Sequence, residues 1–194
     1  MASVVSSTLP ARRRLTRSVR QTSTRHAMSS IGTFHIVSAA KRDSFTEARR
    51  TEKTVTHKKG FLGFGSREIV TGEHYLWEFL DLEAASKHEF DHSGFAIVDY
   101  FFTFVQLPAP LQAQLTAAAS PDGHYFQFEH SLASSIAGYL ESHPPDPAAL
   151  TGFASEQGQD ALAYVPLMTA THHALIQWFR GVSPSQFGVL HLTF

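Results

Sequence analysis

The sequence contains one pattern whose residue types and spacing could support catalysis, the pentapeptide HEFDH at positions 88–92. On a helix, His88 and His92 would lie one turn apart on the same face and could together bind a zinc ion. Glu89 would then act as the general base, because zinc lowers the pKa of a bound water to about 7. The pattern predicts a zinc-dependent hydrolase, provided that these residues are helical.

Over these five residues the chain resembles the zincin metalloproteases, and the resemblance implies zinc as cofactor. The chain departs from that family at Asp91, a position where zincins generally have an uncharged residue. Ser93 and Gly94 favour an end to the helix directly after the second histidine. The interpretation that we prefer is a polar helix end or a loop that binds no metal, in a protein without a cofactor, and zinc is the alternative.

A second candidate is the glycine-rich segment between Lys58 and Arg67, in which three glycines within six residues favour a hairpin tip. Exposed apolar side chains beside basic ones suit an anionic membrane surface, a groove on a partner or single-stranded nucleic acid. The alternative is a tip that folds back and buries its aromatic rings. The candidate binding surface consists of Lys58, Lys59, Phe61, Leu62, Phe64 and Arg67.

The longest apolar segment, residues 94–107, is broken by one charged residue, Asp99. Its β-branched and aromatic residues predict a strand buried on both faces, with a buried helix as the alternative. A carboxylate in such a strand is unfavourable unless it is paired. Asp99 is therefore predicted to be a buried polar residue with an Arg, Lys or His partner.

Charge is distributed very unevenly along the chain. Residues 1–59 hold 13 Lys/Arg and three Asp/Glu, whereas residues 60–194 hold three Lys/Arg and 14 Asp/Glu. Residues 1–27 contain six Arg and no acid, which indicates a disordered basic leader. It is an organelle transit peptide or the result of a start assigned upstream of Met28, and a nucleic-acid-binding arm is a third alternative. A cytoplasmic location follows in the second case, and an organelle in the first.

Composition and patterning predict the elements of one domain over residues 28–194. The chain lacks cysteine, which excludes disulfides and thiolate metal sites, and its apolar runs fall short of the roughly 20 residues that a membrane span needs. Strands are expected at 33–37, 54–56, 67–71, 94–107, 125–128 and 187–194. Helices are expected at 73–90, with a strand as the alternative there, at 110–118 and 171–180, after Ser131 and after Asp146. Residues 41–52 form a loop or a short helix.

These elements predict an α+β fold. We expect a single domain with a mostly antiparallel sheet, helices concentrated in the C-terminal third and a closing C-terminal strand. The function expected from this reasoning is a non-catalytic protein-binding protein, immunity-like or regulatory, whose partner is another protein. The alternatives are the zinc hydrolase and a binder of membranes or nucleic acid that uses the basic N-terminal part or the segment from Lys58 to Arg67.

Overall fold

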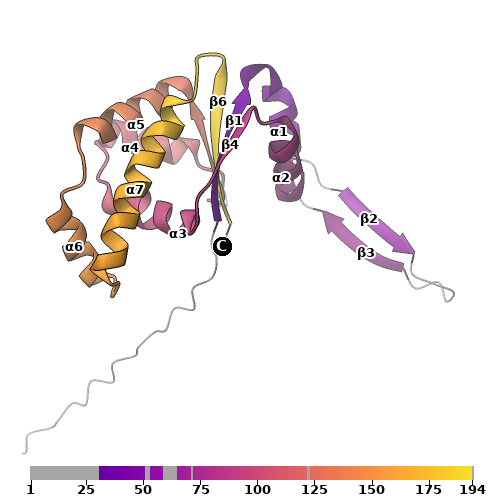
Figure 1. Cartoon of the computed structure of the whole chain (residues 1–194). Helices are drawn as coiled ribbons and strands as arrows, with labels where there is room; N and C mark the ends of the chain where they lie inside the picture. Colours follow the sequence, from indigo (N-terminus) through magenta and orange to yellow (C-terminus); the bar gives the residue numbers. More distant parts are fainter. Residues whose placement is uncertain (1–30, 51–52, 59–64, 71, 122, 194) are drawn as a thin grey trace, which may run out of the picture.

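The computed structural model describes residues 31–50, 53–58, 65–70, 72–121 and 123–193, and Figure 1 shows how they are arranged. The strands are β1 (Ile31–Ser38), β2 (Lys53–Lys58), β3 (Gly65–Val70), β4 (Ser86–His88), β5 (Tyr125–Glu129) and β6 (Gln186–Thr193). The α-helices are α1 (Arg42–Arg50), α2 (Gly72–Glu83), α3 (Ser93–Ile97), α4 (Ala109–Ala118), α5 (His130–Ser142), α6 (Pro147–Glu156) and α7 (Ala161–Arg180). A 3-10 helix η1 (Ala39–Lys41) precedes α1, and a π-helix η2 (Val98–Phe104) follows α3.

Four of the strands form an antiparallel sheet in the order β4-β1-β6-β5. The first and last described strands, β1 and β6, pair along their whole length, from Ile31 with Thr193 to Ser38 with Gln186. The predicted α+β fold with a closing C-terminal strand is thus confirmed. That strand lies inside the sheet, so its backbone groups are hydrogen-bonded on both sides.

Helices cover both faces of this sheet (Figure 1). α1 and α2 lie on one face, and α3 to α7 lie on the other. Residues that alternate along a strand point to opposite faces, and β1 and β6 are buried in both sets of positions. The smaller layer encloses Val37, Phe45, Leu76, Leu80, Tyr125, Phe187 and Val189. The larger layer is rich in aromatic residues and includes Phe34, Phe101, Phe128, Trp178 and Phe179.

The ring of Phe34 in β1 packs over Gly188 of β6. A Cβ atom placed on Gly188 would lie 2.3 Å from Cζ of Phe34. The Phe34 ring therefore occupies the space that a side chain at position 188 would fill. There it packs edge-on against Phe179, with ring centroids 5.5 Å apart, and stacks on Trp178.

The strand predicted at 94–107 is wrong, because the structure places α3 and η2 there. Gly94, Ala96, Ile97, Tyr100 and Phe101 are the buried residues of this segment, and their spacing of three and four residues belongs to a helix face. A continuous apolar run is compatible with either a buried strand or a buried helix, so its composition did not decide between them. The π-helix is marked by Val105, whose N–H donates to the carbonyl of Tyr100, five residues earlier, at 2.9 Å.

The helix predicted at 73–90 is confirmed up to Glu83 and wrong beyond it. After α2 the chain turns, and Ala85 donates a 2.8 Å backbone hydrogen bond to Ile36. Residues 86–88 then pair with β1 as the short edge strand β4. The local helix-forming residues are overridden by the unpaired edge of β1, which needs backbone partners.

The remaining strands form a separate hairpin, here called the arm, which consists of β2 and β3. They pair in register from Lys53 with Val70 to Lys58 with Gly65. The arm projects from the side of the molecule that carries α1 and α2 (Figure 1). In the described part of the chain, no helix has both the length and the apolar character needed to cross a membrane.

Candidate functional site

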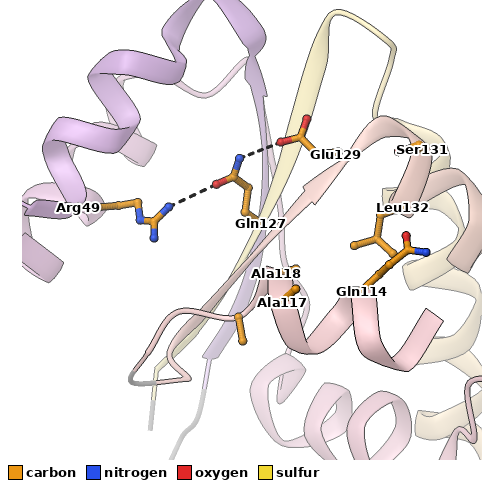
Figure 2. A pocket seen from close by; sticks show the side chains of 9 residues that line it. Arg49, Gln114, Ala117, Ala118, Gln127, Glu129, Ser131 and Leu132 are labelled. Atoms are coloured by element: carbon orange, nitrogen blue, oxygen red, sulfur yellow. Dashed lines mark hydrogen bonds between the residues drawn. The ribbon is translucent and has the colours of Figure 1, made fainter. Parts of the chain in front are cut away.

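A pocket of about 380 Å³ lies at the outer edge of β5, the last strand of the four-stranded sheet. Figure 2 shows Arg49 of α1 on one side of β5 and Gln114, Ser131 and Leu132 on the other. The pocket thus spans the strand edge between the two helical layers. Its wall consists of Arg49, Gln114, Ala117, Ala118, Ala119, Gln127, Glu129, Ser131 and Leu132.

The outer edge of β5 is only partly covered. Near the start of the strand, Ser120 donates a 2.8 Å backbone hydrogen bond to Tyr125, and Ala119 forms an isolated bridge with Phe126. From Gln127 to Glu129, no strand in the described ranges lies beside β5 on this side. An edge of this kind presents backbone N–H and C=O groups with which an incoming extended chain can pair.

One carboxylate lines the pocket, that of Glu129, and it is already engaged. Arg42 donates two parallel hydrogen bonds to it, of 2.6 and 2.8 Å, and the Gln127 amide donates a third of 3.0 Å. These hydrogen bonds, with the one from Arg42 the strongest, hold the pKa of Glu129 below its usual value. The carboxylate therefore remains ionised at neutral pH and is a poor proton acceptor.

Arg49 is in a different situation, although it lies two turns along the same helix. Its Nε donates to the hydroxyl of Tyr125 at 2.6 Å, and its Nη1 makes a long contact of 3.4 Å with the amide oxygen of Gln127. The guanidinium also lies over the rings of Phe45 and Tyr125, at 5.4 and 5.0 Å. Arg49 is half-buried, and none of its contacts among the described residues is a carboxylate.

The histidines of the HEFDH pattern are not on one helix. His88 ends β4, where its Nε2 lies 3.1 Å from the Ser86 hydroxyl, and Glu89 is exposed with Lys87 3.7 Å away. His92 has a φ of 62° and precedes α3 at its N-cap position. The helical spacing that would bring the two imidazoles to one metal is therefore missing. Among the residues that the structure describes, no group of three or more His, Asp or Glu could hold a metal ion.

The candidate surface around the glycine-rich loop falls on the arm. Lys58 ends β2 and Arg67 lies within β3, opposite Thr56. The expected hairpin is thus present. Its tip residues Lys59, Phe61, Leu62 and Phe64 lie outside the described residues.

Asp99 lies on the π-helix and is half-buried rather than buried. Its partner is the hydroxyl of Tyr164 in α7, which donates a 2.7 Å hydrogen bond to Oδ2, and not the Arg, Lys or His that the sequence suggested. Burial and this hydrogen bond raise the pKa of Tyr164, so the tyrosine keeps its proton and can donate it. The pair connects η2 to α7.

A buried histidine, His35, lies on the face of β1 that packs against α2, and it was not expected from the sequence. His35 is fully buried, its Nε2 lies 3.1 Å from the hydroxyl of Thr33, and its Nδ1 has no hydrogen-bond partner among the described residues. Trp77 of α2 packs edge-on against it, and Lys87 lies 5.1 Å above the same indole ring. Burial is the largest cause and the charge of Lys87 the second, and together they lower the pKa of His35 to about 4.

Sequence reasoning also missed Arg49 and the pocket. The basic residues of α1 were visible, but their pairing depends on β5, about 80 positions away in the chain. No protein-family model, curated protein or solved structure matches this chain.

Proposed function

We propose that this chain is a non-catalytic protein-binding protein, of an immunity-like or regulatory kind, that takes a short extended segment of a partner protein at the outer edge of β5. The observation that carries the proposal is the pocket that spans this edge, where β5 has no neighbouring strand in the described ranges. Addition of a strand to an exposed edge is a recurrent mode of peptide recognition, in which the backbone gives affinity and alternate side chains give specificity.

The chemistry of the pocket wall supports binding rather than catalysis. Its ionisable residues are Arg49 and Glu129. An arginine does not lose its proton, and the pKa of Glu129 is held down by Arg42, so neither residue is suited to proton transfer near neutral pH. The same groups are well suited to hydrogen bonding with a bound chain.

Because the chain contains no cysteine, one introduced cysteine can place a cross-linker unambiguously. Gln114→Cys puts the label in the pocket wall, and Gln112→Cys puts it on the same helix at an exposed position outside the pocket. Each variant is labelled with a maleimide photo-cross-linker and irradiated in an extract of the cells that make the protein. We expect a discrete protein adduct from position 114 and none from position 112, with the partner attached through an unstructured or extended segment.

A second pair of variants tests whether the pocket itself is required. Ala117→Trp fills the pocket, whereas Ala113→Trp adds the same ring to the exposed surface of α4, one turn earlier. The adduct should be lost in the first and kept in the second, and Glu89→Gln should leave it unchanged. Equal labelling from positions 112 and 114, or an adduct that survives Ala117→Trp, would show that the partner docks elsewhere.

A further inference from the structure

The surroundings of Arg49 indicate which kind of side chain the bound segment contains. A guanidinium that is partly withdrawn from water is unfavourable unless a charge or sufficient hydrogen bonds compensate it. Arg42, on the same helix, has this compensation in both oxygens of Glu129. Arg49 has one short hydrogen bond, to the neutral hydroxyl of Tyr125, and a long contact with an amide oxygen. Among the described residues, the positive charge in the pocket wall is therefore left without an anion.

The geometry of Arg49 is also fixed in advance. The bond from its Nε to Tyr125 and the stacking over Phe45 and Tyr125 hold the plane of the guanidinium. These contacts use one edge and the faces of the group and leave Nη2 without a hydrogen-bond partner among the described residues. A planar fork that is held in this way can donate to a carboxylate with little further loss of side-chain entropy.

We infer that the pocket recognises an acidic side chain, Asp or Glu, within the extended segment, and that Arg49 is the residue that binds its carboxylate. This inference rests on the proposed function. Alternate residues of an added strand point to opposite faces of the sheet. The acidic residue would point to the α1 side, toward Arg49 and Gln127, and its neighbours in the segment would point to the α4 side. On that side Ala117 and Ala118 leave room, and Gln114 and Ser131 offer polar groups.

A peptide-library selection tests the inference without knowledge of the partner. The immobilised protein is incubated with a pool of eight-residue peptides in which every position is randomised, and the retained peptides are sequenced. We expect Asp and Glu to be enriched at one position, with small or polar residues on either side. Replacement of the acidic residue of a selected peptide by the corresponding amide should weaken its binding about tenfold.

Variants of α1 assign the effect to one residue. Arg49→Gln should abolish the preference for acid over amide, and Arg49→Lys should restore part of it, because the charge returns without the planar fork. Arg50→Gln is the matched control, since it removes the same charge from an adjacent, exposed position on the helix. Thermal unfolding of each variant verifies that it is folded before binding is measured.

These experiments distinguish a failure of the role of Arg49 from a failure of the proposed binding function. The selected peptides could lack an acidic position and still fail to bind the Ala117→Trp variant. That result would overturn the role of Arg49 and leave the binding function in place. An acidic preference that is unchanged in Arg49→Gln also overturns it. Selection that enriches no peptide at all, together with the absence of an adduct from position 114, overturns both.

Discussion

At the scale of single residues, Arg42 and Arg49 show how two arginines of one helix can have different partners. Both lie on α1 and both reach β5. Arg42 forms an ion pair with Glu129, the last residue of β5. Arg49 meets the neutral side chains of Tyr125 and Gln127, so its charge remains available. Tyr125, Gln127 and Glu129 lie on the same face of β5, so the difference follows from which of these side chains each arginine reaches along the strand.

The buried imidazole of His35 should make stability depend on pH. Its pKa is about 4 in the folded protein and 6.5 in the unfolded chain, so the unfolded chain binds the proton more readily. The stabilising effect of a neutral His35 is fully present above pH 6.5 and is lost as the pH falls toward 4. Groups that face His35 include Lys87 and His88 of β4, Asp81 of α2 and His191 of β6.

We therefore expect His35→Phe to flatten the loss of stability between pH 6.5 and 4, by up to about 3 kcal/mol at the lower limit. Urea unfolding at half-unit steps of pH measures this. His143→Gln removes an exposed histidine instead and should retain the wild-type slope. A His35→Phe protein with the same pH profile as the wild type would show that another group causes the acid sensitivity.

At the scale of elements, the fit of β1 against β6 depends on an absent side chain. The ring of Phe34 fills the position that a Cβ at Gly188 would occupy. Phe34 is fully buried among other aromatic residues, so it cannot move aside without displacing them. Glycine at position 188 is needed for space and not for an unusual backbone angle.

Gly188→Ala should destabilise the protein by about 1–3 kcal/mol, because the added methyl overpacks the core. Gly152→Ala is the matched control. Gly152 lies in α6, where a Cβ would have no atom of the described residues within 4 Å, and alanine there should stabilise the helix by about 0.5–1 kcal/mol. Chemical denaturation of both variants gives the two values, and a neutral effect of Gly188→Ala would mean that the ring of Phe34 can move aside at no cost.

At the scale of the whole molecule, the arm and the sheet are separate pairing units. β2 and β3 pair with each other, and in the described ranges neither pairs with a strand of the four-stranded sheet. The α1–α2 layer contacts the sheet through Phe45, Leu76 and Leu80, which lie outside the arm. The larger sheet and its helices therefore have their own pairing and their own core.

Replacement of residues 53–70 by a short Gly/Ser linker should change the stability of the rest by less than about 1 kcal/mol, since loop length alone has a small effect on closure entropy. The cross-link from position 114 should persist. Thermal unfolding and the cross-linking assay measure these two outcomes. Loss of cooperative unfolding would show that the arm supports the α1–α2 layer, and loss of the adduct alone would place part of the binding surface on the arm.

Local chemistry explains which predictions from sequence succeeded. Asp146 caps α6 and accepts from the N–H groups of Ala148 and Ala149, as its position before Pro147 indicated. The last strand and the arm were recognised from alternation and from glycines. The helix expected at 171–180 is present but begins ten residues earlier, because Asp160 caps α7 and Pro166 is accommodated inside it.

The predictions that failed concern segments whose partners are distant in the chain. Residues 94–107 form a largely apolar run that is compatible with a strand or a helix, and in the structure residues 94–104 are helical and pack against β1 and α7. Residues 86–88 form a strand because the edge of β1 is next to them. The helical spacing expected for His88 and His92 does not occur for the same reason, because β4 and the turn that follows it replace the expected helix.

By itself, the amino-acid sequence determined the fold class, the positions of most helices and the arm, because caps, turns and apolar periodicity act over a few residues. Only the tertiary structure decided what the charged and polar side chains do. It paired Arg42 with Glu129, gave Asp99 a tyrosine, buried His35 and, among the described residues, left Arg49 without a carboxylate beside an open strand edge. Charge compensation and burial depend on neighbours across the sheet, and those neighbours exist only once the chain has folded.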